Sequence, residues 1–83
     1  METNIVLFIC IEIEPVPNIR KIYGELSLRK DVREIYEITG EYDLIIKAEL
    51  KNLQDLRSLV HYVRDKEGVK NVYTMISYHQ VKP

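Results

Sequence analysis

The chain has 83 residues, which is enough for one small domain, residues 1–83, whose core alone confers only marginal stability. Its 12 basic and 13 acidic residues leave a net charge of −1, and no lysine-arginine run indicates nucleic acid as the main partner. The single cysteine, Cys10, excludes a disulfide framework within the chain and suits a reducing, cytoplasmic environment.

The first predicted strand covers residues 4–13 (NIVLFICIEI) and is rich in β-branched residues. Its apolar run is far shorter than a membrane span and lacks the features of a secretion signal. Pro15 and Pro17 end this strand. A helix is predicted next, with Pro17 or Asn18 at its N-terminus. Its apolar residues recur at helical spacing: Ile19, Ile22, Tyr23 and Leu26.

The rest of the chain predicts three strands and a second helix. The strands cover residues 32–39, 43–50 and 69–78. Asn52, with Asp55 three residues later, is expected to cap the helix, and Gly68 suits the position after its end. The apolar stripe of this helix is Leu53, Leu56, Leu59, Val60 and Val63.

This β-α-β-β-α-β order predicts an α+β fold of the ferredoxin-like type, a four-stranded antiparallel sheet with two helices on one face. Right-handed crossovers place the first and third strands in the centre. The first strand is apolar at both odd and even positions, and the sequence leaves open which set faces the helices. Ile45, Tyr73 and Met75 are candidates for the uncovered face. Because such a face is costly to expose, we predict an obligate homodimer that packs sheet against sheet, a dimeric α/β barrel-like assembly.

No motif indicates a catalytic, metal or cofactor site. His61 lies away from the leucine stripe and His79 near the C-terminus, so both are expected to be solvated, and neither has a metal-ligand partner at useful spacing. Cys10, in a central strand, is expected to be buried filler and not a reactive thiol. The third strand has no aromatic residue, unlike the central strands of RNA-recognition motifs.

The turn ITGEYD, between the second and third strands, carries more chemistry than a hairpin needs. Gly40 can adopt a positive φ, and successive amides in such a turn form a concavity for an anion. Asp43 supplies a carboxylate for an ammonium group, so the two together suit a free amino acid. Tyr42 would wall the pocket or offer its hydroxyl, and Glu41 would be solvated. Glycine and aspartate are also ordinary turn formers, so the turn alone leaves both interpretations open.

The stretch VREIYEITGEYDLIIKAEL resembles the strand-turn-strand of the Lrp/AsnC family of feast/famine regulators, in which V/I-T/S-G-x-x-D precedes an apolar strand. Thr39, Gly40 and Asp43 stand at the marked positions. The stretch EGVKNVYTMISYHQVK is similar to the closing segment of the family, with Thr74 in the last strand and a terminal Val-Lys. The resemblance covers nearly the whole chain and is to the family's effector-binding module, the RAM domain.

The resemblance implies an assembly and a site. RAM domains dimerise through their sheets, usually assemble further into an octamer, and bind small effectors, mostly amino acids, in clefts between dimers. The effector-binding residues implied here are Thr39, Gly40, Glu41, Tyr42, Asp43, Thr74 and Ile76. Family members normally begin with a helix-turn-helix domain, whereas here the first RAM strand starts within a few residues of Met1. We therefore expect a stand-alone module without direct contact to nucleic acid or membrane.

The leading interpretation is a non-enzymatic amino-acid sensor that needs no cofactor and modulates a partner, for which a full-length Lrp/AsnC regulator is the natural candidate. One alternative is a dimeric α+β barrel enzyme of the monooxygenase or isomerase type that uses His61, His79 or a tyrosine. Another is an ACT-like regulatory domain, whose ligand loop would be residues 14–18.

Overall fold

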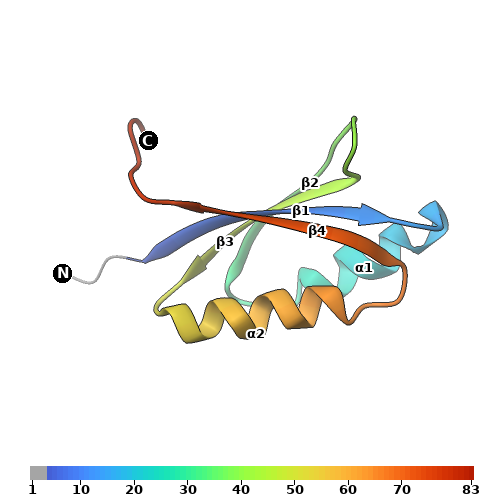
Figure 1. The fold of residues 1–83 in the computed structure, drawn as a ribbon, viewed down its shortest axis with the longest axis horizontal. Helices are drawn as coiled ribbons and strands as arrows, with labels where there is room; N and C mark the ends of the chain where they lie inside the picture. Colours follow the sequence, from blue (N-terminus) through green and yellow to red (C-terminus); the bar gives the residue numbers. More distant parts are fainter. Residues whose placement is uncertain (1–3) are drawn as a thin grey trace.

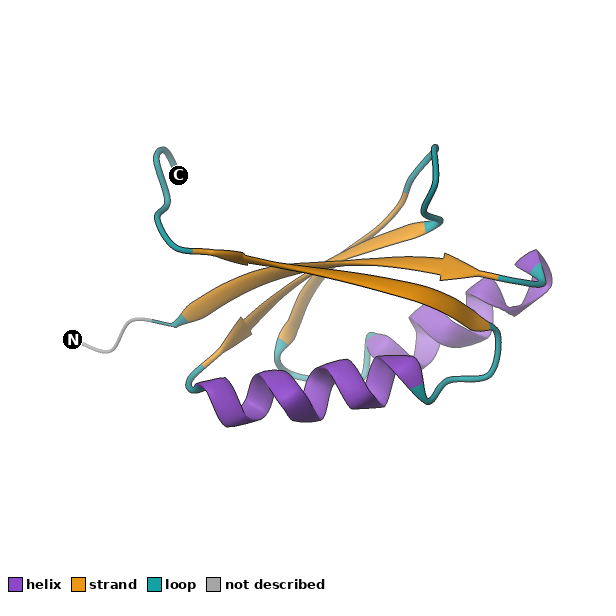
Figure 2. Cartoon of the chain, viewed as in Figure 1, coloured by secondary structure: helices purple, strands orange, loops and turns teal. Residues whose placement is uncertain are grey.

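The computed structural model describes residues 4–83 and shows one sheet and two α-helices. In chain order the elements are β1 (Ile5–Ile13), the short 3-10 helix η1 (Val16–Asn18), α1 (Ile19–Leu26), β2 (Val32–Glu37), β3 (Leu44–Leu50), α2 (Leu53–Arg64) and β4 (Val69–Ser77). Both α-helices lie on one face of the sheet, and the other face is left bare (Figure 1 and Figure 2). The predicted ferredoxin-like order is confirmed.

The four strands of the sheet are arranged in the order β2-β3-β1-β4, and all neighbouring strands are antiparallel. β1 and β3 are therefore central, as right-handed crossovers predict. The most apolar strands thus have a neighbour on each side. In contrast, β2 carries Arg33, Glu34 and Glu37 and forms an edge, where charged side chains discourage pairing with another sheet.

The hydrophobic core lies between the sheet and the helices. β1 contributes its odd-numbered residues, which answers the question that the sequence left open: Leu7, Ile9 and Ile11 are fully buried. The other large contributors come from β3 and both helices: Leu44, Ile46, Leu50, Ile22, Leu26, Leu59 and Val63. Burying each of these side chains contributes about 1.5–3 kcal/mol, which makes this layer the main source of stability.

Two details of the predicted elements are wrong. Leu53 is 64% exposed and does not belong to the buried stripe, because it is the first residue of α2 and the stripe reaches the core only from Leu56 onward. The strands β2 and β4 end at Glu37 and Ser77, earlier than predicted. After Glu37 the chain leaves β2 and enters the turn around Gly40.

Asn52 caps α2 as predicted, but Gly68 does not directly follow the helix, because α2 ends at Arg64 with Asp65 as its C-cap and Gly68 lies in the turn before β4. The Asn52 side chain accepts a hydrogen bond from the Asp55 backbone N–H at 3.0 Å. Gly68 has a φ of +95°, and a Cβ there would lie 2.6 Å from the side-chain nitrogen of Asn18. Asn18 forms no side-chain cap for α1 and lies against this glycine instead. Gly68 therefore permits the close approach of the segments that enter α1 and leave α2.

A cluster of charges joins the end of α1 to α2. The Arg29 guanidinium donates two hydrogen bonds to Asp31, at 3.0 and 2.8 Å, and lies 4.8 Å from the centre of the Tyr62 ring. Lys66 Nζ lies 3.9 Å from the same ring and 3.2 Å from the Glu25 carboxylate. Tyr62 is thus in contact with two cations, an arrangement that favours the aromatic ring over an aliphatic side chain here.

Replacing Asp31 with asparagine is expected to destabilise the fold at neutral pH but not in acid. The hydrogen bond from Arg29 lowers the pKa of Asp31 below its ordinary 3.8. A carboxyl with a lowered pKa stabilises the fold above its unfolded-state value, and the contribution is lost as the pH falls through the folded-state value. We expect Asp31→Asn to cost about 1 kcal/mol at neutral pH.

Urea unfolding of Asp31→Asn and the unchanged protein, at neutral pH and again well below the ordinary carboxyl pKa, measures this effect. The exposed Glu67 provides a matched control, Glu67→Gln, which should match the unchanged protein throughout. An equal loss of stability at both pH values would show that Asp31 does not act through its charge.

Candidate functional site

The sheet face opposite the helices carries a continuous set of apolar side chains. Strand register places there Val6, Phe8, Cys10, Tyr36, Ile45, Tyr73 and Met75, and we refer to this set as the open face. Tyr36 and Tyr73 are each 54% exposed, and Met75 is 36% exposed. Each large side chain left in water forgoes about 1.5–3 kcal/mol of burial, so this surface favours a covering partner.

Cys10 lies within the open face and is only 8% exposed in the single chain. Burial raises the pKa of its thiol above the ordinary 9.0. The thiol therefore stays protonated near neutral pH, where a thiolate would be needed for nucleophilic or redox chemistry. This agrees with the expectation that Cys10 fills space.

The turn between β2 and β3 rises from the same side of the sheet as the open face (Figure 1). The Ile38 N–H donates to the Asp43 carbonyl oxygen at 3.0 Å, which closes the turn. Gly40 has a φ of +109°, a backbone conformation that residues with a Cβ rarely adopt. Thr39, Gly40 and Glu41 are exposed, so this part of the turn is accessible to a ligand.

Asp43 anchors the turn to the end of β1. Its backbone N–H donates to the Ile11 carbonyl oxygen at 2.9 Å, and its Oδ2 accepts a hydrogen bond from the Ile13 N–H at 2.7 Å. The carboxylate therefore has the structural role that the sequence left open, and its partner, the Ile13 N–H, is what sequence reasoning missed. A carboxylate has about four acceptor positions, so this one bond fixes its direction and leaves Oδ1 able to accept from a ligand.

Tyr42 connects the turn to the open face. Its ring stacks on that of Tyr73, with 6.3 Å between the ring centroids and an interplanar angle of 22°. Tyr73 opposes Cys10 in the register of β4 with β1. Tyr73 is absent from the predicted site residues, although strand alternation already puts it on the same face as Met75. The stack gives the turn a rigid aromatic wall.

Thr74 and Ile76 are on the side of the sheet opposite to the one from which the turn rises. They oppose Ile9 and Leu7 of β1, so their side chains face the helix side of the sheet. The turn instead contacts β1 at its other end. The structure thus brings Tyr42 and Asp43 together with the end of β1, and it does not bring Thr74 and Ile76 to them.

The residues of the alternative interpretations are on the surface. His61, on α2, and His79, after β4, are both exposed. Residues 16–18 form η1, in which the Asn18 N–H donates to the Pro15 carbonyl oxygen at 3.1 Å.

Among residues 4–83, no three His, Cys, Asp or Glu side chains are grouped so that they could hold a metal ion. No helix in this described part is both long and apolar enough to cross a membrane.

The sequence matches a known family over nearly its whole length. The family model of the Lrp/AsnC ligand binding domain matches residues 6–83. The chain belongs to this family. The HTH-type transcriptional regulator FL11 of Pyrococcus furiosus is 33% identical over 73 residues, which cover 88% of this chain and 48% of FL11. Homocitrate synthase of Sulfolobus acidocaldarius is 29% identical over 73 residues, which cover 88% of this chain and 16% of the enzyme.

Solved structures share the fold of this Lrp/AsnC domain. E. coli AsnC has a TM-score of 0.89 and 19% identity, covering 99% of this chain and 56% of AsnC. FFRP-DM1 has a TM-score of 0.82 and 30% identity, covering 88% of this chain and 97% of FFRP-DM1. The regulator NMB0573 of Neisseria meningitidis, solved as a complex with L-Met, has a TM-score of 0.84 and 17% identity, covering 95% and 53%. The predicted family and fold are both confirmed.

Proposed function

We propose that this Lrp/AsnC domain is a non-enzymatic, cytoplasmic module that binds an amino acid and couples binding to oligomerisation, and so modulates a partner regulator. The proposal rests on the turn of residues 39–43, where the exposed backbone around a positive-φ glycine is followed three residues later by a carboxylate whose Oδ1 accepts no hydrogen bond within residues 4–83. Backbone amides suit the α-carboxylate of an amino acid, and Asp43 suits its ammonium group. Tyr42, stacked on Tyr73, would form the wall.

The relatives support a regulatory role and an amino-acid ligand. The chain spans about half the length of FL11 and a sixth of the homocitrate synthase, so neither relative's whole activity transfers to it. A segment common to a transcriptional regulator and an enzyme is explained most simply as a regulatory module present in both, since their different activities then lie in the parts that the two do not share. The ligand of the NMB0573 complex is itself an amino acid.

The open face supports assembly through the sheet. We infer that two chains pack their open faces together, because this removes apolar side chains of both from water. The turn rises from this side of the sheet, so it would lie at the margin of the interface (Figure 1). Thr74 and Ile76 face the helix side, so they would line an effector cleft only if a neighbouring chain supplied them. Assembly of dimers into an octamer would provide such neighbours.

An effector would act by binding one state of assembly more tightly than another, which is how a ligand shifts an equilibrium between states. A full-length Lrp/AsnC regulator is the proposed partner, because a ligand-binding domain of the same fold could form the same sheet-to-sheet contact in a mixed assembly. The module would then change the regulator's assembly without contacting DNA.

Isothermal titration of the protein with each of the twenty amino acids tests the proposal. We expect a small subset of them to release or absorb heat, and the same subset to change the mass measured by light scattering. If none of the amino acids binds at millimolar concentration, the sensor function is wrong. If one binds without any change in assembly, sensing stands and the coupling to oligomerisation is wrong.

A further inference from the structure

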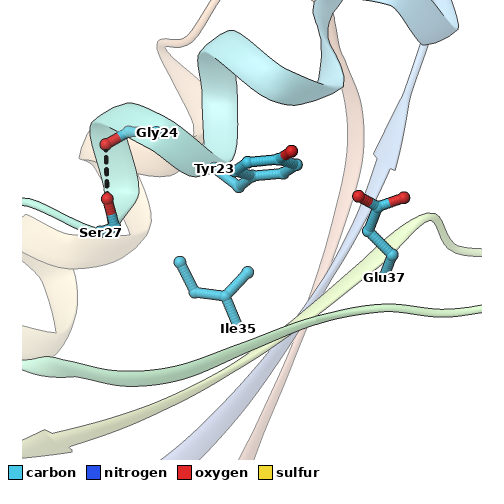
Figure 3. A pocket seen from close by; sticks show the side chains of 5 residues that line it. All are labelled: Tyr23, Gly24, Ser27, Ile35 and Glu37. Carbon is cyan, nitrogen blue, oxygen red and sulfur yellow. Dashed lines mark hydrogen bonds between the residues drawn. The ribbon is translucent and has the colours of Figure 1, made fainter.

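A cavity of about 500 Å³ lies between α1 and β2, on the helix side of the sheet (Figure 3). Tyr23, Gly24 and Ser27 line it from α1, and Ile35 and Glu37 line it from β2. Ile35 and Glu37 pair with Ile46 and Leu44, whose side chains are fully buried under the helices. The cavity is therefore on the opposite side of the sheet from the open face, and its Glu37 precedes the effector turn by two residues.

The lining of this cavity combines an apolar slot with one negative charge. The Tyr23 ring projects from α1 with the Ile35 side chain below it, and the Glu37 carboxylate faces the hydroxyl end of the ring (Figure 3). Glu37 is the only one of the five lining residues that is charged at neutral pH. Within residues 4–83, no ion pair or side-chain hydrogen bond engages Glu37. Its carboxylate is thus free to pair with a cation.

Gly24 and Ser27 are the small residues on the α1 side of the cavity. A glycine in the middle of a helix is disfavoured by its backbone entropy. Nothing requires it here, because its φ is ordinary for a helix and an added Cβ would have no atom within 4 Å. The Ser27 hydroxyl donates to the Gly24 carbonyl oxygen at 2.7 Å, which turns this small side chain back onto its own helix. Both residues leave the α1 side of the cavity unfilled.

We propose that this cavity binds a small alkylammonium ion, an aliphatic primary amine that carries no carboxylate. The ammonium group would pair with Glu37, and the aliphatic chain would lie between Tyr23 and Ile35. None of the lining residues is basic, so the carboxylate of an amino acid would find no cation to pair with and would lie near the Glu37 carboxylate. This second site prefers amines, whereas the turn suits zwitterions.

Titration with 3-methylbutylamine tests the proposal, because this amine has the side chain and ammonium group of leucine but no carboxylate. We expect a Kd on the order of 1 mM, since so small a ligand makes few contacts. In an Asp43→Asn background, where the turn is disabled, L-leucine should bind at least about tenfold more weakly than the amine. Equal or tighter binding of leucine in that background would overturn the proposed amine selectivity.

Two variants assign amine binding to this cavity. Glu37→Gln keeps the size of an exposed side chain and should weaken amine binding by about threefold to fivefold, as expected for an exposed ion pair. Gly24→Leu places a larger side chain on the lining of the cavity, at a position where an added Cβ meets no atom within 4 Å, and it should weaken binding while thermal unfolding shows an intact fold. The matched control Glu67→Gln removes an exposed charge elsewhere and should bind like the unchanged protein.

Unchanged amine affinity in Glu37→Gln would overturn the proposal, as would the absence of amine binding to the unchanged protein. If Gly24→Leu unfolds, Glu37→Gln alone decides the outcome. The outcome is distinguishable from that of the amino-acid sensor. If the turn site is wrong, amino acids do not bind there but the amine still binds in the cavity. If the cavity site is wrong, the amine does not bind but the amino acid still binds at the turn.

Discussion

Replacing Phe8 with glutamate is expected to leave the protein monomeric and folded. Phe8 lies on the open face, opposite Lys47 on one side and Met75 on the other, and it is outside the helix-side core. In the monomer a carboxylate at this position would be solvated and beside Lys47, so the fold would tolerate it. Between two packed sheets the same charge would lose its water, which costs several kcal/mol.

Light scattering and analytical ultracentrifugation measure the mass of Phe8→Glu, and far-ultraviolet circular dichroism confirms that it is folded. If the open face holds the dimer, the substitution should raise the Kd for dimer dissociation at least about a hundredfold. Leu28→Glu is the matched control, since Leu28 is 82% exposed and lies in the connection between α1 and β2, away from the open face. A Phe8→Glu protein with the mass of the unchanged protein would show that the chains associate elsewhere.

Asp43 has two roles that a pair of substitutions separates. Asp43→Asn keeps a side-chain oxygen that can accept the hydrogen bond from Ile13 but removes the negative charge. We expect it to fold like the unchanged protein and to bind the effector amino acid about a hundredfold more weakly, because the ammonium group loses its charged partner. Titration calorimetry measures the affinity, and thermal unfolding measures the fold.

Asp43→Ala removes the charge and also leaves the partly buried Ile13 N–H without its partner. An unsatisfied buried donor costs about 1–3 kcal/mol, so this variant should lose both affinity and stability. If Asp43→Asn binds the effector normally while Asp43→Ala is unstable, Asp43 is a structural residue of the turn. In that case the ammonium group is recognised by another residue, and the proposed role of the carboxylate is wrong.

The Phe8→Glu variant also tests whether the effector site is shared between chains. Thr74 and Ile76 lie on the helix side of β4 and do not reach the turn of their own chain. If neighbouring chains complete the site, the monomeric Phe8→Glu protein should bind the amino acid more weakly than the assembled protein, although its turn is intact. Equal affinity would place the whole site within a single chain.

The residue pattern alone predicted the order of the elements, the central place of β1 and β3, and glycines at two positions, 40 and 68, that have a positive φ. These features depend on short-range properties. A period of two or of 3.6 distinguishes strand from helix, and a positive φ demands glycine wherever it occurs. The N-cap at Asn52 is equally local, because it joins residues three positions apart.

Contacts between distant parts of the chain depended on the tertiary fold. The apolar residues of β1 occupy both faces, and only helix packing decides that Leu7 and Ile9 are covered while Phe8 is not. The bond from Ile13 to Asp43 joins residues 30 positions apart. The cavity between α1 and β2 likewise depends on how two separately formed elements approach. Local preferences specify each element, whereas the spacing and register between elements follow from packing the whole core at once.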